Sequence, residues 1–507
     1  MNIKEAKQEI KNTVRAYLLK NEAGEYEIPS IRQRPILLIG PPGIGKTQIM
    51  EQVARECKIG LVAYTITHHT RQSAVGLPFI KEEEYNGTVY SVTEYTMSEI
   101  ISSIYEKIKE SGLIEGILFI DEINCVSETL APTMLQFLQC KTFGNQAIPE
   151  GWIIVAAGNP PEYNKSVREF DMVTLDRVRK MEIAPDLQVW KQYARAQHID
   201  NAILSYLDLK PQNFYRTEAD VDGMQFVTAR GWEDFSNLLH TYEKLNIPME
   251  ENIILEFLQH EDVAQDMAAY LDLYEKYKDQ YGIREILQGK TKPDAYASIY
   301  KASFDERLSV VNLLLSGLST YFQVVTKEKY ITDIWFSFLK QYRAKLEKTT
   351  EITSVYQEML EEKEKMLEQT KKGGLYTKEE LYLQNVCVKF LHENKPGDMS
   401  SVDAAFESAR CGFDQQREKL ENAEDEAMKA LEYAFDFVEQ AFEGGQELVV
   451  FVTELTLNPD SAAFLSDNEC ERYYNYNKEL LVGSRRAELL SELEVGTIRE
   501  QEHIREL

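Results

Sequence analysis

The residues best suited to chemistry lie at positions 40–47, which read GPPGIGKT. They follow a four-residue apolar run at 36–39 and precede apolar residues at helical spacing. Three glycines let the backbone turn successive N–H groups toward an anion, and a helix N-terminus adds positive potential there. Lys46 would contact the β- and γ-phosphates of a nucleotide, and the Thr47 hydroxyl is placed to ligate Mg²⁺. The pattern therefore predicts a phosphate-binding loop. The binding residues that we expect are Gly40, Pro41, Pro42, Gly43, Ile44, Gly45, Lys46 and Thr47.

A pair of carboxylates follows another apolar run. Residues 117–120 are Ile-Leu-Phe-Ile, and Asp121 and Glu122 come directly after them. Ligands of parallel sheets bind at the carboxyl ends of the strands, so we expect both carboxylates beside the phosphate loop. Asp121 is expected to hold Mg²⁺ together with Thr47, and Glu122 to polarise an attacking water. Acidic residues often end strands, and the pair is informative because a phosphate loop precedes it.

A polar residue also ends the buried run at 152–158, where Asn159 is followed by Pro160. From a neighbouring strand end, the Asn159 amide could hydrogen-bond the attacking water or the γ-phosphate. An Asn before Pro is also a common turn former. Both interpretations stay open at this point.

The order of these motifs resembles that of AAA+ ATPases, and within them the MoxR-type, dynein-related subgroup. The resemblance covers about residues 30–280 and rests on five strings. They are GPPGIGKT at 40–47, ILFIDEIN at 117–124, AAGNP at 156–160, LDRVR at 175–179 and TARGWEDF at 228–235. The resemblance implies ATP and Mg²⁺ as cofactors, ATP hydrolysis, and assembly of the chain into a ring, with a hexamer as the expected size.

The resemblance also assigns roles within the nucleotide site. Residues 40–47 would be the Walker A loop, Asp121 the Walker B magnesium residue, Glu122 the catalytic base and Asn159 the sensor-1 residue. MoxR-type proteins usually carry a basic residue where this chain has Cys125. That departure touches no residue of hydrolysis.

Two arginines complete the set that the resemblance implies. Arg177 would be the arginine finger that enters the next subunit's site, with the nearby Arg179 as the alternative. Arg230 would be the sensor-2 arginine on the lid, which detects the γ-phosphate. It precedes an amphipathic stretch, so it could instead simply cap that helix.

The elements that must position these residues divide the chain into five parts. The fold class we expect is α/β: a P-loop NTPase αβα core with a parallel sheet, then an all-α lid and an all-α C-terminal extension. The expected parts are an N-terminal helix in 1–30, the nucleotide-binding core in 31–185, the helical lid in 186–285, a helical lid extension in 286–346 and an acidic helical domain in 347–507.

Composition narrows the class of protein. The 507 residues are 43% hydrophobic and 28% charged, as in soluble globular proteins. Six cysteines without a C-x-x-C pair predict reduced thiols and no zinc site. No apolar run approaches the roughly 18 residues of a membrane span and no signal peptide is recognisable, so we expect a cytoplasmic protein. The net charge of −28 disfavours broad binding to nucleic acid, although a local basic pore would be compatible with it.

Two further segments have no assigned role. Asn86-Gly87 is a type I′ turn signal between residues 81–85 and 88–95, and predicts a hairpin that is either a functional insertion or a structural flap. Residues 347–507 hold 36 acidic and 18 basic side chains. Their acidic helices either dock a basic partner or present a solvated face. Thr377 and Ser400 or Ser401 are expected to open two of these helices.

The leading functional hypothesis is Mg-dependent ATP hydrolysis by a ring ATPase that remodels or matures a partner protein, as a chaperone does. MoxR-type ATPases often act with a partner that contains a von Willebrand factor A domain, and the resemblance implies such a partner. One alternative is a nucleotide-dependent switch or scaffold with low turnover, which would not need Glu122. Another is a nucleic-acid remodelling AAA+ subunit, which the acidic balance disfavours. A GTPase is disfavoured because no N-K-x-D string follows the loop.

Overall fold

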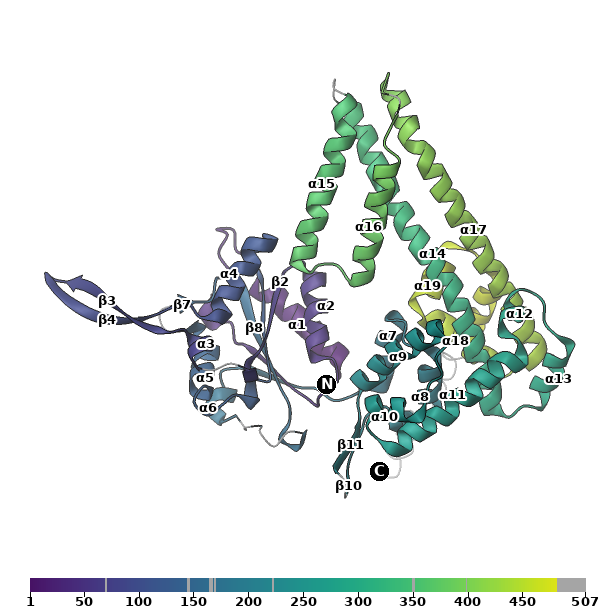
Figure 1. Cartoon of the computed structure of the whole chain (residues 1–507), viewed down its shortest axis with the longest axis horizontal. Helices are drawn as coiled ribbons and strands as arrows, with labels where there is room; N and C mark the ends of the chain where they lie inside the picture. Colours follow the sequence, from purple (N-terminus) through teal and green to yellow (C-terminus); the bar gives the residue numbers. More distant parts are fainter. Residues whose placement is uncertain are drawn as a thin grey trace, which may run out of the picture.

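A computed structural model describes residues 1–480, except for 69–70, 144–145, 164–166, 168–169, 221–222, 349–351 and 398. Figure 1 shows two parts, an α/β core with the N-terminus and a larger helical part. The core carries a long two-stranded ribbon, and the helical part sends several long helices to one side. The α/β class with a helical C-terminal region is confirmed.

The core is built on a five-stranded parallel sheet with the strand order β2-β5-β8-β1-β9. Ile39 pairs with both Gly158 and Glu182, and Thr65 pairs with Asp121. The carboxyl ends of the strands therefore meet at one edge, as the motifs require. The strands are β1 (Ile36–Ile39), β2 (Gly60–Thr65), β5 (Gly116–Asp121), β8 (Trp152–Gly158) and β9 (Arg179–Glu182).

Helices cover both faces of this sheet, because alternate strand residues point to opposite sides. On one face, Leu38 and Phe119 pack with α1 and α2; on the other, Leu37 and Leu118 pack with α4 and α5. The αβα core is thus a three-layer structure with two separate apolar cores. The helices around the sheet are α1 (Ile3–Tyr17), α2 (Lys46–Cys57), α3 (Arg71–Val75), α4 (Glu99–Ser111), α5 (Ala131–Cys140) and α6 (Met172–Leu175).

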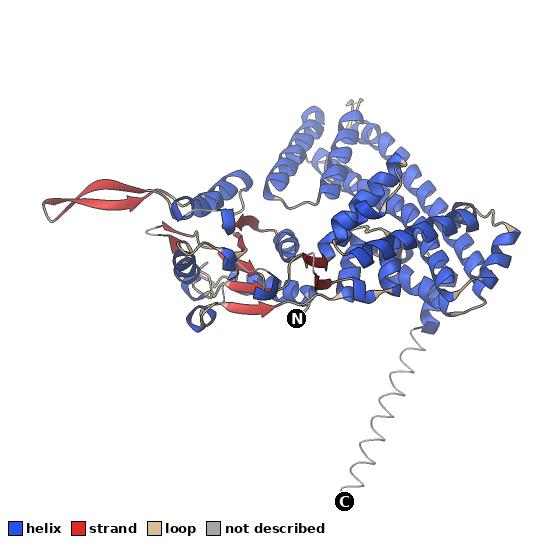
Figure 2. Cartoon of the chain, turned by 60° about the horizontal axis from the view of Figure 1, so that its bottom comes forward, coloured by secondary structure: helices blue, strands red, loops and turns tan. Residues whose placement is uncertain are grey.

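The insertion after β2 is the expected hairpin, formed by β3 (Pro78–Tyr85) and β4 (Thr88–Tyr95). Asn86 has φ 52° and Gly87 φ 83°, as a type I′ turn requires. The ribbon extends away from the body of the protein (Figure 2). A shorter ribbon, β6 (Thr142–Phe143) with β7 (Gln146–Ala147), precedes β8.

The region expected to be an all-α lid is helical apart from one ribbon. The helices are α7 (Leu187–Ala196), α8 (Asn201–Leu209), α9 (Ala229–Leu245), α10 (Glu251–Leu258) and α11 (Glu261–Tyr281). Between α8 and α9 the chain forms an antiparallel pair, β10 (Arg216–Asp220) with β11 (Gly223–Val227). Helical periodicity alone did not indicate these short strands.

The rest of the described chain is helical. Thr377 and Glu380 form the expected capping box, and Ser401 rather than Ser400 caps its helix. The helices are α12 (Ile283–Leu287), α13 (Pro293–Lys301), α14 (Phe304–Leu346), α15 (Ile352–Gly373), α16 (Lys378–Glu393), α17 (Val402–Phe442), α18 (Gln446–Leu457) and α19 (Pro459–Asp467).

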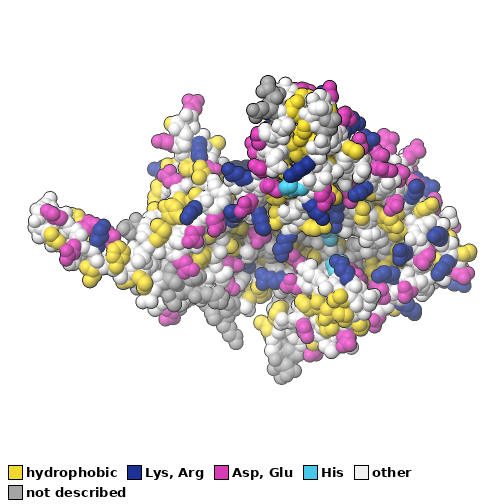
Figure 3. All heavy atoms as spheres, turned by 45° about the horizontal axis from the view of Figure 1, so that its top comes forward, with side chains coloured by type: hydrophobic (Ala, Val, Ile, Leu, Met, Phe, Trp, Pro, Cys, Tyr) yellow, Lys and Arg dark blue, Asp and Glu magenta, His cyan; other side chains and the backbone are white. Residues whose placement is uncertain are grey.

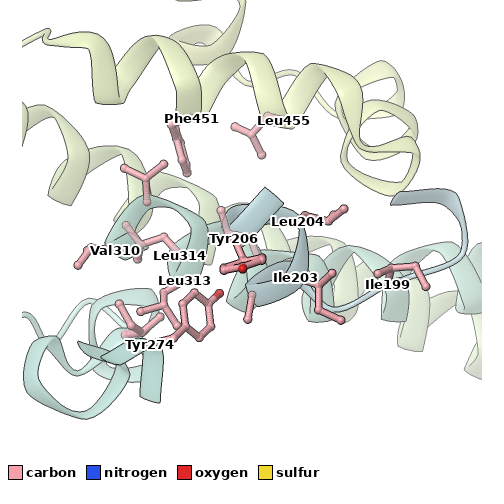
Figure 4. Close-up of a cluster of buried hydrophobic side chains, with 14 of the residues drawn as sticks. Ile199, Ile203, Leu204, Tyr206, Tyr274, Val310, Leu313, Leu314, Phe451 and Leu455 are labelled. Atoms are coloured by element: carbon pink, nitrogen blue, oxygen red, sulfur yellow. The ribbon is translucent and has the colours of Figure 1, made fainter. Parts of the chain in front are cut away.

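The boundary expected between residues 346 and 347 does not follow the packing. One apolar core joins the lid helices with the C-terminal half of α17, with α18 and with α19. In Figure 4, Ile203 and Tyr206 of α8 lie near Leu314 of α14 and Phe451 of α18. Arg195 of α7 and Glu454 of α18 also form an ion pair with an N–O distance of 2.7 Å. The lid and the last helices are therefore one packed unit, whereas α15, α16 and the start of α17 form a smaller core with the end of α14.

Helix α14 corrects the expectation that no stretch approaches a membrane span. Its most apolar 18-residue window has a mean hydropathy of 1.5, so it could span a bilayer by length and composition. Half of that window is buried inside the protein, as in a core helix. Helices α18 and α19 pass the same test only as a pair bent by 85°. Length and composition are therefore weak grounds for a span here.

The shared core predicts that a substitution in α17 destabilises the lid. Phe435 is fully buried in the core that α17 shares with the lid helices and packs on Phe451 of α18, so Phe435→Ala should lower the free energy of unfolding by about 3–5 kcal/mol. Tyr382→Ala on α16 is the control, because Tyr382 is 64% exposed and the change should cost far less. Chemical denaturation followed by circular dichroism measures both. Equal stability of the two variants would contradict the shared core.

Candidate nucleotide-binding site

The loop between β1 and α2 has the backbone that phosphate binding requires. Gly43 and Gly45 have φ of 72° and 92°, in the left-handed region that favours glycine. A Cβ atom on Gly43 would lie 2.8 Å from Thr228 of the lid, so that position also has no room for a side chain. Helix α2 begins at Lys46, directly after the loop. Its first N–H groups and its dipole therefore face the loop.

The Lys46 ammonium lies inside the loop, and its side chain is largely buried. It donates hydrogen bonds to the carbonyl oxygens of Gly40 and Pro41, at 2.7 and 2.8 Å, and to Oδ1 of Asn159 at 2.9 Å. Burial lowers the pKa of Lys46 to about 8, while the charge of Asp121 raises it and that of Arg230 lowers it. All three hydrogen-bond acceptors are neutral oxygens. An anionic phosphate would therefore meet a cation that has no carboxylate bonded to it.

Thr47 and Asp121 lie side by side at the edge of the sheet. The Thr47 hydroxyl donates to Oδ2 of Asp121 at 3.1 Å, and Oδ1 of Asp121 accepts the backbone N–H of Glu122 at 2.9 Å. A hydroxyl and a carboxylate from two elements thus meet at one point. Such oxygen donors are the ones that Mg²⁺ prefers, so the residues present fit this ion.

Glu122 has a left-handed backbone, with φ 57°, which is uncommon for a residue other than glycine, asparagine or aspartate. Its Oε2 accepts a hydrogen bond from the hydroxyl of Thr67 at 3.0 Å. Thr67 follows β2, the strand next to β5. Our reading of the sequence did not single out Thr67. Its place just past a strand end, at the same edge as Asp121, was the signal available.

Asn159 is held by a second asparagine. The Asn124 amide donates to the carbonyl oxygen of Asn159 at 2.8 Å, and its Oδ1 accepts the Asn159 N–H at 3.3 Å. A Cβ atom on Gly158 would lie 2.5 Å from that Oδ1, so the close approach requires glycine there. Asn124 lies in the string ILFIDEIN, yet the sequence alone gave it no role. The structure makes it a positioning residue for Asn159.

The structure separates the two arginines proposed as the finger. Arg179 on β9 forms an ion pair with Glu9 at 2.5 Å and donates to Thr13, both on α1. Arg177 lies exposed after α6 and hydrogen-bonds Gln139 of α5. Among the described residues, neither arginine has a hydrogen bond to the phosphate loop of its own chain. Arg177 is exposed, whereas Arg179 is only partly exposed.

The lid contacts the phosphate loop directly. The backbone N–H of Arg230 donates to the carbonyl oxygen of Gly43 at 3.1 Å, and the Tyr215 hydroxyl donates to that of Pro42 at 2.9 Å. Thr228 caps α9 through the N–H of Gly231, so the helix does not need Arg230 as a cap. The Arg230 side chain is exposed, and its charge lowers the Lys46 pKa.

Most of the residues expected at the site come together, although α2, three strands of the sheet and the lid supply them. This geometry defines a P-loop nucleotide-binding core. Residues 36–174 match the family model described as "ATPase family associated with various cellular activities (AAA)". The chain therefore contains an AAA ATPase domain, a class of domain that binds and hydrolyses ATP.

Other comparisons add little. A search of curated proteins found no match to the chain. Among solved structures, the chain is similar to the AAA domain of FIGL-1 in complex with ADP, at 19% identity and a TM-score of 0.23. That match covers 46% of this chain and 63% of the other, less than two thirds of its length. A TM-score this low establishes nothing about the arrangement of the parts.

The close approach of Gly158 to Asn124 predicts the effect of an added methyl group. Gly158→Ala should displace Asn124 and with it Asn159, and lower the rate of ATP hydrolysis between about tenfold and a hundredfold. ATP binding, measured by titration with a fluorescent analogue, should change much less. Gly397→Ala is the control, because its Cβ would lie 3.9 Å from the nearest atom. A Gly158→Ala variant as active as the wild type would exclude the positioning role of Asn124.

Proposed function

We propose that this chain is a Mg-dependent ATPase of the MoxR type that works as a ring and remodels a partner protein. One observation supports the hydrolytic part most directly. Lys46, Thr47, Asp121 and Asn159, from α2 and two strands, are joined in pairs by side-chain hydrogen bonds. One edge of the sheet therefore holds the groups that would bind phosphate, which are the Lys46 ammonium and the Thr47 hydroxyl. The carboxylate of Asp121 lies at the same edge.

The residues act on ATP as follows. The N–H groups of the loop and the Lys46 ammonium bind the phosphates, which replace neutral oxygens as partners of Lys46. Thr47 and Asp121 would hold Mg²⁺, which supplies positive charge to the phosphates when bound. Glu122 accepts a proton from the attacking water, and Asn159 orients that water. Glu122 must leave Thr67 to do so, because their hydrogen bond occupies one of its oxygens.

Ring assembly is supported by the surface around Arg177. Met172 is 85% exposed, and its neighbour Val173 is also exposed, on the short helix that precedes Arg177. Among the described residues Arg177 has no ion pair with a carboxylate, and apolar side chains next to such an arginine fit a contact with the site of a second copy. In that arrangement Arg177 supplies positive charge to the phosphates of its neighbour. We infer a hexamer from the resemblance to MoxR-type ATPases.

Contacts between the phosphate loop and the lid would transmit a change at the nucleotide to the helices that hold a partner protein. Phosphate bound at residues 40–47 changes the surroundings of Gly43 and Pro42, whose carbonyl oxygens hold Arg230 and Tyr215 of the lid. Because the lid shares one core with α17–α19, any tilt of the lid moves those helices as well. The client we propose is a protein, with a von Willebrand factor A domain protein as the associated partner. We propose a cytoplasmic location for this work.

A low-turnover scaffold and a nucleic-acid remodeller are less well supported. A scaffold would not need Glu122 at the strand end. For nucleic acid, the relevant feature is charge: acidic and basic side chains are interspersed over the helical face in Figure 3, with no broad basic area there. The same mixture favours a solvated face over an acidic docking surface.

Glu122→Gln separates binding from hydrolysis. The amide cannot accept the proton, so the hydrolysis rate should fall about 10²- to 10⁴-fold while ATP affinity stays within a few-fold of the wild type. Phosphate release and equilibrium binding of ATP measure the two quantities. Lys46→Ala is the contrasting variant, which should lose binding itself. Wild-type turnover in Glu122→Gln would remove the base from this mechanism.

Mixing two inactive variants tests the finger. Arg177→Ala keeps the base and lacks the finger, whereas Glu122→Gln keeps the finger and lacks the base. Mixed rings contain interfaces with both groups intact, so the mixture should recover a measurable part of the ATPase activity that either variant lacks alone. Arg179→Ala is the control: it should keep its own activity, because Arg179 pairs with α1 of its own chain. A mixture as inactive as its components would contradict a finger in trans.

A further inference from the structure

Three side chains of the lid, away from the nucleotide site, form a cluster with metal-ligating chemistry. Asp200 lies in the turn before α8, and His240 and Glu243 lie three residues apart on α9, on one face of that helix. One ligand atom from each residue lies within 4.8 Å of the other two. The donor set is one imidazole nitrogen and two carboxylate oxygens.

The His240 ring is already oriented as in a metal ligand. Its Nε2 lies 3.1 Å from the carbonyl oxygen of His198, which can only accept a hydrogen bond, so Nε2 carries the proton. Nδ1 then has its lone pair free, and it lies 3.4 Å from Oδ2 of Asp200. Two ligands of a tetrahedral ion with bonds of about 2.1 Å are separated by about 3.4 Å. Metal-bound histidines commonly donate their other N–H to a backbone carbonyl in this way.

Asp200 is fixed in place with one oxygen to spare. Its Oδ1 caps α8 by accepting the N–H of Ala202 at 2.8 Å, and its backbone N–H donates to the Ser236 hydroxyl at 2.9 Å. One carboxylate oxygen of Glu243 lies within 4.8 Å of one oxygen of Asp200. Two carboxylates so placed disfavour each other's charge. A bound cation would remove that repulsion.

A buried hydroxyl without a partner points to a further ligand. Tyr274 of α11 is 6% exposed, and its hydroxyl makes no hydrogen bond to any residue that the structure describes. Burial raises the pKa of Tyr274, and the charge of Asp200 is the next largest cause of that rise. Figure 4 shows the Tyr274 ring among the buried side chains around α8 and α14. A water molecule on a metal ion would give this hydroxyl the partner that it lacks.

A cation on α11, Lys278, lies one turn after Tyr274. Its ammonium bonds to Glu275 at 3.0 Å, and its charge lowers the pKa of Asp200. Lys278 is half exposed and has Glu275 as its own partner. It therefore offsets part of the negative charge without supplying a ligand position for the cluster.

We propose that Asp200, His240 and Glu243 bind one divalent transition-metal ion, with Zn²⁺ as the ion to test and water as the remaining ligand. A mixed nitrogen and oxygen set suits Zn²⁺ and is a poor match for Mg²⁺, which prefers oxygen alone. The ion would tie the turn before α8 to the C-terminal half of α9. Helix α9 begins beside Arg230, about 15 Å away along its axis, so the ion would stiffen the element that carries this arginine.

Zinc binding to the full-length protein, without a histidine tag and without nucleotide, tests the proposal. Competition with a chromophoric chelator should give one site per chain in the presence of millimolar Mg²⁺, and Zn²⁺ should raise the melting temperature. Asp200→Asn and Glu243→Gln should each weaken that site at least tenfold, and His240→Ala should remove it. Asparagine can still cap α8, and His240 and Glu243 are not core residues, so circular dichroism should show folded variants.

The matched control is His392→Ala. His392 also lies beside a carboxylate, Glu364, at 2.7 Å, but this pair has no third ligand among the described residues. His392→Ala should therefore keep the zinc stoichiometry, the affinity and the rise in melting temperature. The proposal is overturned if His240→Ala binds Zn²⁺ as the wild type does, if His392→Ala loses the site instead, or if the wild type binds no Zn²⁺ tighter than the chelator detects.

Discussion

The buried ammonium of Lys46 is the interaction around which the nucleotide site is built. A charged group that leaves water needs hydrogen-bond partners, and here two carbonyl oxygens of the loop and the amide of Asn159 supply them. Those partners can be in place only if the loop has left-handed glycines and β8 ends next to β1. The close approach of Gly158 to Asn124, and the bonds from Asn124 to Asn159, follow from the same need. The strand order and the loop conformation thus both place hydrogen-bond acceptors around the Lys46 ammonium, the group that binds phosphate.

The second constraint is that the lid cannot be separated from the end of the chain. The small ribbon and five lid helices leave an apolar surface, and α14, α17, α18 and α19 cover it. The ion pair of Arg195 with Glu454 lies in the same interface. A lid that moves with nucleotide state must therefore carry a much larger body with it. In the function proposed above, the change begins at the phosphates in the AAA domain, and the size of the helical part sets how far that change reaches.

Local signals explain which parts could be predicted from sequence. The phosphate loop, the Asp121-Glu122 strand end, the Asn86-Gly87 turn and the Thr377 capping box each depend on neighbours a few residues away, so their patterns are complete in the sequence. Thr67, Asn124 and Tyr215 act across strands or between domains. Apart from the place of Thr67 just after a strand end, the residues around them form no local pattern that predicts these contacts. The division expected at residue 346 rests on composition, which does not show how the helices pack. The chain becomes more acidic after residue 346, which suggested a boundary. However, residues 427–442 of α17, far beyond that point, belong to the apolar core that includes the lid helices.

The helical part also touches the core at a second place, which limits how the lid can move. The end of α15 meets the end of α4: the Lys107 ammonium donates to the carbonyl oxygen of Lys372 at 2.8 Å, and Leu113 lies against Gly373. Helix α4 leads directly into β5, the strand that ends at Asp121. The chain therefore forms a closed path from the phosphate loop through the lid, α14 and α15 and back to the strand of the carboxylates (Figure 1). A rigid rotation of the lid about the loop would shear this second contact, because α15 packs with the end of α14. Helix α14 contributes its first part to the core of the lid and its end to the core with α15 and α16. If the lid rotates, either α14 bends between these two cores or the contact between α15 and α4 opens. The position of the lid and this contact are therefore coupled.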